Sequence, residues 1–404
     1  MAFTPFITRL YGPVSYGLQG LFISVVSLLS IVAALSYPTA IVLPRSDIDA
    51  KGIARLSIYT GIGVTMLTSI VLYFVGDNVL KLMNAGEISA FEFLIPVTML
   101  VTVFASVLSQ WLIRKKAFEL TARYAIINAL LVNLAKVVMG LIYPTALMLI
   151  ATNLAVTVLG TVLTYLAWLN WHSRQRVPDV TEEPATKLFE LARRHYDFPL
   201  LRTPQNLINA FSQSLPLILL AIYFSAGAAG QYSIALAVLS VPSALIGGSV
   251  MSVFYPKINE AFHKGENTRK LIVNVTGGMA ATGAIPFMIV MLFGPELFQL
   301  VFGEAWRSSG IYAQLLSPWL FLQYINKPSI SAIPALGIQH GLLIYEIFST
   351  GTKILALWFG FSIYHNPVVA IGLFSFAGSI AYIWLILWVI RKSGEQSIKK
   401  FAIS

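Results

Sequence analysis

Residues 193–257 read RRHYDFPLLRTPQNLINAFSQSLPLILLAIYFSAGAAGQYSIALAVLSVPSALIGGSVMSVFYPK, a basic cluster followed by two long apolar runs. A turn of small residues at Ser225–Gly230 separates the runs. Each run holds about 20 residues or more, which at about 1.5 Å per residue spans a hydrocarbon core of roughly 30 Å. Because the turn is too short to hold a domain, this stretch predicts a helical hairpin across a membrane.

The composition of the whole chain also indicates a membrane protein. Of its 404 residues, 57% are hydrophobic and 11% are charged, whereas soluble domains carry about 25% charged residues. The net charge of +10 does not indicate nucleic-acid binding, because the basic residues fall at the ends of predicted helices. The chain has no cysteine, which excludes disulfides and cysteine-ligated metals.

The apolar runs predict eleven membrane-spanning helices and a short apolar piece at residues 1–8. The short piece lacks the charged start and cleavage site of a signal peptide. We expect it to be the outer end of a first helix that is otherwise largely truncated, followed by a turn at Arg9–Pro13. The predicted spans are residues 17–43, 56–75, 91–113, 122–142, 146–169, 204–223, 229–255, 271–293, 311–333, 341–363 and 368–390.

The distribution of Lys and Arg predicts the orientation of these spans. If the C-terminus lies inside, most basic residues fall in the inner connections, and the outer ones hold only Arg9, Lys81 and Arg307. Inner loops of membrane proteins are enriched in Lys and Arg. We therefore predict a cytoplasmic C-terminus.

The order of the spans predicts an all-α polytopic membrane protein with two six-helix lobes related by a parallel repeat. The span that ends at Pro44-Arg45 corresponds to the one that ends at Pro256-Lys257, and both run in the same direction. Two such halves would form a cleft, and rocking of the halves would give alternating access. The expected parts are an N-terminal lobe at 1–169, a cytoplasmic linker with a surface helix at 170–203, a C-terminal lobe at 204–390 and a cytoplasmic tail at 391–404.

Lys136, Glu346 and Lys353 are ionisable residues inside predicted spans, where a charge costs about 2.5–3.5 kcal/mol on insertion scales. Lys353 lies near the middle of its span, so we expect it to face a cavity. Lys136 lies near the outer end of its span, where it either snorkels to the interface or contacts a ligand. Glu346 lies two helical turns from Lys353, and both ion coupling and a structural role remain open.

Polar residues at the start of the second half form a stripe on one helical face. Asn206, Asn209 and Gln213 are spaced by three and four residues. Such a stripe either joins membrane helices or lines a wet cavity. We expect a cavity, because a helix that begins the second lobe should face the cleft. Arg9, at an outer helix end, either anchors the headgroup region or contacts a ligand.

A series of short segments resembles the Wzx-type O-antigen and polysaccharide flippases of the MOP superfamily, to which the MATE transporters also belong. Their order and spacing carry the resemblance over nearly the whole chain. The segments are Thr8–Pro13 with Tyr16–Leu18, Ala40–Pro44, Trp111-Leu112 with Arg114 and Lys116, Tyr196–Pro199, Leu215-Pro216, Gly230–Tyr232, Phe302–Glu304 with Trp306, and Gly310–Ala313.

The resemblance implies a flippase in the bacterial inner membrane, with a MATE-like fold and no enzymatic activity. Its substrate would be an undecaprenyl-diphosphate-linked oligosaccharide of O-antigen, lipopolysaccharide or another surface polysaccharide. Its partners would include a polysaccharide polymerase and a chain-length regulator. The diphosphate needs cations, which Arg9, Lys136, Lys353 and Arg202 could supply, and the sugars need amides, which Asn206, Asn209 and Gln213 offer.

Two other function classes remain open on sequence grounds. A MATE-like antiporter of small molecules would share the fold, but it needs buried carboxylates, and only Glu346 lies deep in a span. A membrane polysaccharide polymerase or ligase would need a large outer segment, and no such segment is predicted. The sequence contains no P-loop pattern and no metal-ligand spacing of His and Glu, so no cofactor is expected.

Overall fold

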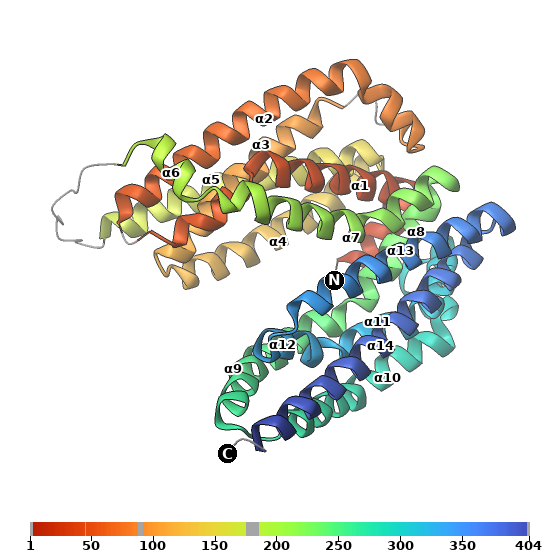
Figure 1. The fold of residues 1–404 in the computed structure, drawn as a ribbon. Coiled ribbons are helices and arrows are strands. Elements are labelled where there is room, and N and C mark those ends of the chain that lie inside the picture. The colour runs from red at the N-terminus through yellow and green to blue at the C-terminus, as the bar shows by residue number, and fades with distance from the viewer. Residues whose placement is uncertain (1–2, 45, 88–91, 175–185, 402–404) are drawn as a thin grey trace. The chain divides into compact units, whose positions relative to one another are not determined.

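The computed structural model describes residues 3–44, 46–87, 92–174 and 186–401, and every regular element in these ranges is a helix (Figure 1). The helices group into two compact units, Met1–Gly230 and Gln231–Ser404. Within the described residues, eight helices are long and apolar enough to cross a membrane. The prediction of an all-α, multi-pass membrane protein is therefore confirmed.

Helix α1 is the element on which the first unit is built. It contacts α2, α3, α4, α5 and α7, and it buries a row of apolar side chains that includes Leu18, Leu21 and Phe22. The elements of this unit are α1 (Thr4–Ala34), η1 (Tyr37–Val42), α2 (Asp47–Leu82), α3 (Leu94–Arg114), α4 (Phe118–Ile142), α5 (Ala146–Arg174), α6 (Leu188–Arg194), η3 (Phe198–Arg202) and α7 (Thr203–Tyr223).

The turn predicted at Arg9–Pro13 is a kink inside α1 rather than a loop. Gly12 adopts φ 70° and ψ 172°, a conformation open to glycine, and helical geometry resumes beyond it. At the other end, Leu35 and Ser36 have positive φ values of 46° and 55°. The span predicted at 17–43 is therefore divided, because these residues end α1 and a 3₁₀ helix, η1, follows.

Two glycines allow α1 to approach the start of α8 (Ala226–Leu239) closely. A Cβ atom on Gly17 would lie 1.7 Å from the backbone oxygen of Ala226, and one on Gly230 would lie 1.9 Å from the backbone oxygen of Pro13. Small residues at such crossings let helix backbones meet, which is a common basis of helix association in membranes.

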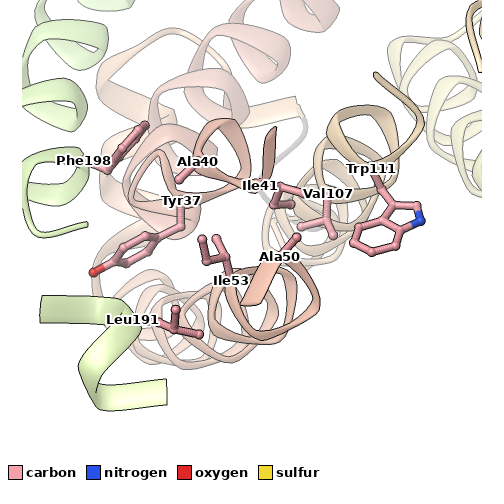
Figure 2. Packing of buried hydrophobic residues seen from close by; sticks show 9 residues of the cluster. All are labelled: Tyr37, Ala40, Ile41, Ala50, Ile53, Val107, Trp111, Leu191 and Phe198. Carbon is pink, nitrogen blue, oxygen red and sulfur yellow. The ribbon is translucent and has the colours of Figure 1, made fainter. Parts of the chain in front are cut away.

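The linker carries a helix, as the sequence predicts, and α6 packs on the start of α2. Leu191 is fully buried in an apolar cluster contributed by five elements (Figure 2). A Cβ atom on Gly52 would lie 2.4 Å from a methyl carbon of Leu191, so glycine allows this packing. The Nη1 atom of Arg194 lies 3.7 Å from Oδ2 of Asp49. Residues 175–185 of the predicted linker lie outside the described residues. The cluster comprises Tyr37, Ala40, Ile41, Ala50, Ile53, Val107, Trp111, Leu191 and Phe198.

The second unit contains longer or more interrupted helices than the predicted spans. The span predicted at 229–255 contains a π-helical segment, and the one at 311–333 is divided at Asn326. The predicted tail at 391–404 continues α14 as far as Phe401. The remaining elements are η4 (Ser243–Gly247), α9 (Gly248–Lys264), α10 (Thr268–Phe302), η5 (Glu304–Trp306), α11 (Arg307–Ile325), α12 (Lys327–Leu336), α13 (Gln339–Tyr364) and α14 (Pro367–Phe401).

Helix α7 packs on α1 and lies in the first compact unit. The sequence predicts that residues 204–223 begin the C-terminal lobe. The contact of α7 with α1 is what shapes the site described below. The lobe boundaries and the parallel repeat stay predictions.

We predict that Gly17→Leu destabilises the first unit strongly, because the new side chain would collide with backbone that cannot rotate away. Overpacking in a core costs about 1–3 kcal/mol, occasionally more. The measurement is the thermal unfolding midpoint of the detergent-purified protein. Gly63→Ala is the matched control, since nothing lies within 4 Å of a Cβ at Gly63. Equal midpoints for the two variants would contradict the close contact.

Candidate functional site

A cavity of about 390 Å³ lies between α1 and α7 in the first unit. This volume falls at the lower end of the range of ligand pockets, roughly 300–1,000 Å³. The lining is polar in most places, which is unusual for two helices that are otherwise apolar enough to span a membrane. The lining residues are Ser27, Ile31, Asn206, Asn209, Ala210, Gln213 and Ser214.

The polar stripe of α7 forms one wall of this cavity. Asn206, Asn209 and Gln213 all line it, so the stripe faces α1 across open space. The side-chain amide of Gln213 donates to the amide oxygen of Asn209 one turn away. Buried leucines (Leu215, Leu217 and Leu220) pack the part of α7 that follows the stripe. The helix therefore combines a polar first half with a well-packed second half.

Ser36 connects the start of α7 to the end of α1. Its hydroxyl oxygen accepts a hydrogen bond from the amide of Asn206 at 3.2 Å, and the Thr203 hydroxyl lies 3.0 Å from it. Ser36 is buried and has a left-handed backbone conformation, with φ 55°. The end of α1 thus fixes the orientation of the first amide in the cavity wall.

Arg202 lies one helical turn before Asn206, at the last position of the π-helical segment η3. Its guanidinium carbon lies 5.7 Å from the ring centroid of Phe198, a residue of the buried cluster. Arg202 itself is exposed. The cation is therefore held at the end of the amide stripe and remains accessible.

Lys136 and Arg9 lie in the first unit but are not among the described residues that line the cavity. The backbone oxygen of Lys136 accepts a hydrogen bond at 2.9 Å from the hydroxyl of Tyr11, which fixes α4 against α1. Tyr11 also packs on Gly140, where a Cβ would lie 2.7 Å from its ring. Lys136 is half-buried, and Arg9 is exposed.

Lys353 lies in the second unit, over the face of a buried tryptophan. Its Nζ is 5.9 Å from the ring centroid of Trp319, which is 7% exposed. Cations are attracted to the electron-rich face of indole at such distances. Within the described residues, Lys353 forms no ion pair, and Glu346, two turns away, is exposed. The sequence pattern does not predict Trp319 as the partner of Lys353.

The residues brought together at the cavity are suited to hydrogen bonding with a polar ligand. Amides and hydroxyls offer both donors and acceptors. In the part of the chain that the structure describes, no three His, Cys, Asp or Glu residues come close enough to hold a metal ion. Sequence reasoning missed Ser27, Ser36 and Ser214, because an isolated serine in a membrane helix usually bonds its own preceding turn.

Comparison with known protein families gives one match over most of the chain. Residues 6–310 match the model of a family described as "Polysaccharide biosynthesis protein". Lipopolysaccharide biosynthesis protein WzxC of Escherichia coli (strain K12) is 30% identical over 162 residues, 39% of this chain and 32% of that protein. Teichuronic acid biosynthesis protein TuaB of Bacillus subtilis (strain 168) is 22% identical over 177 residues, 40% of this chain and 36% of that protein. The chain spans about a third of the length of these relatives.

Solved structures of low sequence identity share the fold. An inward-facing multidrug resistance MATE family transporter of the MOP superfamily has a TM-score of 0.74 and 15% identity, covering 98% of this chain and 94% of its own. The lipid II flippase MurJ, in an inward closed conformation, has a TM-score of 0.69 and 13% identity, covering 99% and 88%. Because the family match covers well over half of its residues, this chain belongs to the polysaccharide biosynthesis protein family, and it has the fold of the MOP superfamily.

Proposed function

We propose that this protein is a flippase that moves a lipid-linked oligosaccharide across a membrane. The observation that carries the proposal is the amide- and hydroxyl-lined cavity on the membrane helix α7, in a member of a polysaccharide biosynthesis family. A sugar presents many hydroxyl groups, each of which both donates and accepts hydrogen bonds. Amides and serine hydroxyls also both donate and accept, so those that line the cavity can exchange hydrogen bonds with such groups.

The substrate we propose is an undecaprenyl-diphosphate-linked oligosaccharide, either O-antigen or the repeat unit of another surface polysaccharide. The protein would act in a bacterial inner membrane by alternating access, with its C-terminus in the cytoplasm. A polymerase and a chain-length regulator would use its product. The name of the relative WzxC, a lipopolysaccharide biosynthesis protein, and the polar cavity support this substrate class.

The diphosphate is the part of the substrate that opposes transfer, because its charge loses hydration in the membrane interior. We propose that Arg202 meets it first, since this cation is exposed beside the amide stripe. Lys136 and Lys353 would compensate the charge deeper in the protein, and Arg9 at the outer end. The polyprenyl tail would remain in the lipid, alongside exposed apolar side chains such as Leu130 and Leu134 of α4.

Complementation tests the proposal directly. We expect expression of the gene to restore surface glycan in a bacterium that lacks its own polysaccharide flippase and has a matched glycan pathway. The measurement is surface glycan, with membrane expression quantified alongside. Good expression without restored glycan would contradict the proposal. Drug efflux in the same cells would then favour a MATE-like antiporter.

Replacing the amides of α7 should reduce export without unfolding the protein. We expect the double variant Asn209→Leu and Gln213→Leu to lower the rate of glycan export at least about tenfold. The loss of two hydrogen bonds, one at each position and each of about 1 kcal/mol, corresponds to a factor of roughly thirty. Ser69→Ala is the control, because its hydroxyl bonds the Thr65 carbonyl on α2, away from the cavity. Equal export by both variants would remove α7 from the substrate path.

Neutralising the membrane lysines should have a larger effect than exchanging one cation for another. We expect Lys136→Met together with Lys353→Met to abolish export, and Lys353→Arg to retain part of it, because a guanidinium also binds phosphate and stacks on indole. The measurement is export in cells at matched protein levels. Unchanged export by the double methionine variant would exclude a role of these cations in diphosphate passage.

A further inference from the structure

We infer that the cavity between α1 and α7 is a subsite for an uncharged sugar, and that the protein therefore disfavours a uronic acid at that place in the repeat unit. The inference rests on the proposed function and makes it more specific. It assigns the sugar and the diphosphate to different places along α7. It also adds Ser27 and Ser214 to the binding residues.

The lining of the cavity is polar but uncharged. None of its seven residues carries a charge, and five of them offer amide or hydroxyl groups. Three of the five lie on the stripe of α7, and Ser27 approaches from α1. A neutral sugar can exchange its bonds to water for bonds to these groups. A carboxylate would give up part of its hydration without meeting a cation in this lining, and an ion that loses water without gaining a partner of opposite charge is destabilised.

The amides are held in place before a ligand binds. The side chain of Gln213 donates to Asn209, so the remaining N–H groups of Asn209 and the oxygen of Gln213 are left for a ligand. Asn206 donates to Ser36, which leaves its own amide oxygen as an acceptor. Paired donors and acceptors on neighbouring turns suit adjacent hydroxyl groups on a sugar ring. Pre-organised groups lose little entropy when they bind.

The cation nearest along the helix lies beyond one end of the stripe. Arg202 precedes Asn206 by four residues and Gln213 by eleven, or about 6 Å and about 16 Å along a helix at about 1.5 Å per residue. A diphosphate at Arg202 would thus place the sugars that follow it along the amides. The cavity volume of about 390 Å³ suits a part of an oligosaccharide, not a whole repeat unit.

Direct binding of simple glycosides tests the inference without a transport assay. The protein, purified in lipid nanodiscs, is titrated at pH 7 with methyl N-acetylglucosaminide and with methyl glucuronide, and binding is followed by saturation-transfer NMR. We expect the neutral glycoside to bind at least about fivefold more tightly. Gln213→Leu should weaken its binding, whereas Ser69→Ala, outside the cavity, should leave it unchanged.

A cation introduced into the cavity lining should reverse the preference for the neutral glycoside over the glucuronide. We expect Gln213→Arg to bind the glucuronide more tightly than the neutral glycoside, because a guanidinium pairs with a carboxylate. Its unfolding midpoint is compared with that of Gln213→Leu to show that the variant is folded. Equal binding of both glycosides by the unmodified protein, no binding of either, or an unchanged ratio in the arginine variant would overturn the inference.

The failure of this inference can be told apart from failure of the proposed function. Export of neutral and uronic-acid repeat units at equal rates would uphold the flippase and refute the neutral subsite. A neutral preference in binding, in a protein that restores no glycan, would uphold the subsite and refute the flippase.

Discussion

The close contact between α1 and the start of α8 constrains the rest of the first unit. Gly17 and Gly230 let two backbones meet where any side chain would collide. Because α7 ends at Tyr223 and α8 begins at Ala226, this contact also fixes where α7 ends. The amides of α7 lie opposite Ser27 of α1 across the cavity.

The amides of this site lie on a helix that is apolar enough to cross a membrane. Their hydrogen-bond partners are another amide of the same helix and the hydroxyl of Ser36. Lys353 lies over the face of Trp319 and forms no ion pair with any residue that the structure describes. An aromatic partner holds a cation without neutralising it, so its charge remains available to an anion.

The packing of the linker shows how a weak sequence signal becomes a defined contact. The sequence predicts an amphipathic helix around Leu188–Leu191, but its pattern does not say which face it covers. In the structure Leu191 lies in the buried cluster (Figure 2). Its side chain occupies the space that a Cβ atom on Gly52 would need, and Arg194 reaches Asp49. The same cluster contains Phe198, and the guanidinium group of Arg202 lies over the ring of Phe198. The linker therefore supports the start of α7.

The helices follow from local sequence, because about 20 apolar residues in lipid must satisfy their backbone groups within one helix. Local sequence also places Asn206, Asn209 and Gln213 on one face, since their spacing matches the helical period. Helix packing determines what that face meets, which compact unit contains α7, and that the face of Trp319 lies beside Lys353. Those contacts depend on how helices approach one another, which local periodicity does not encode.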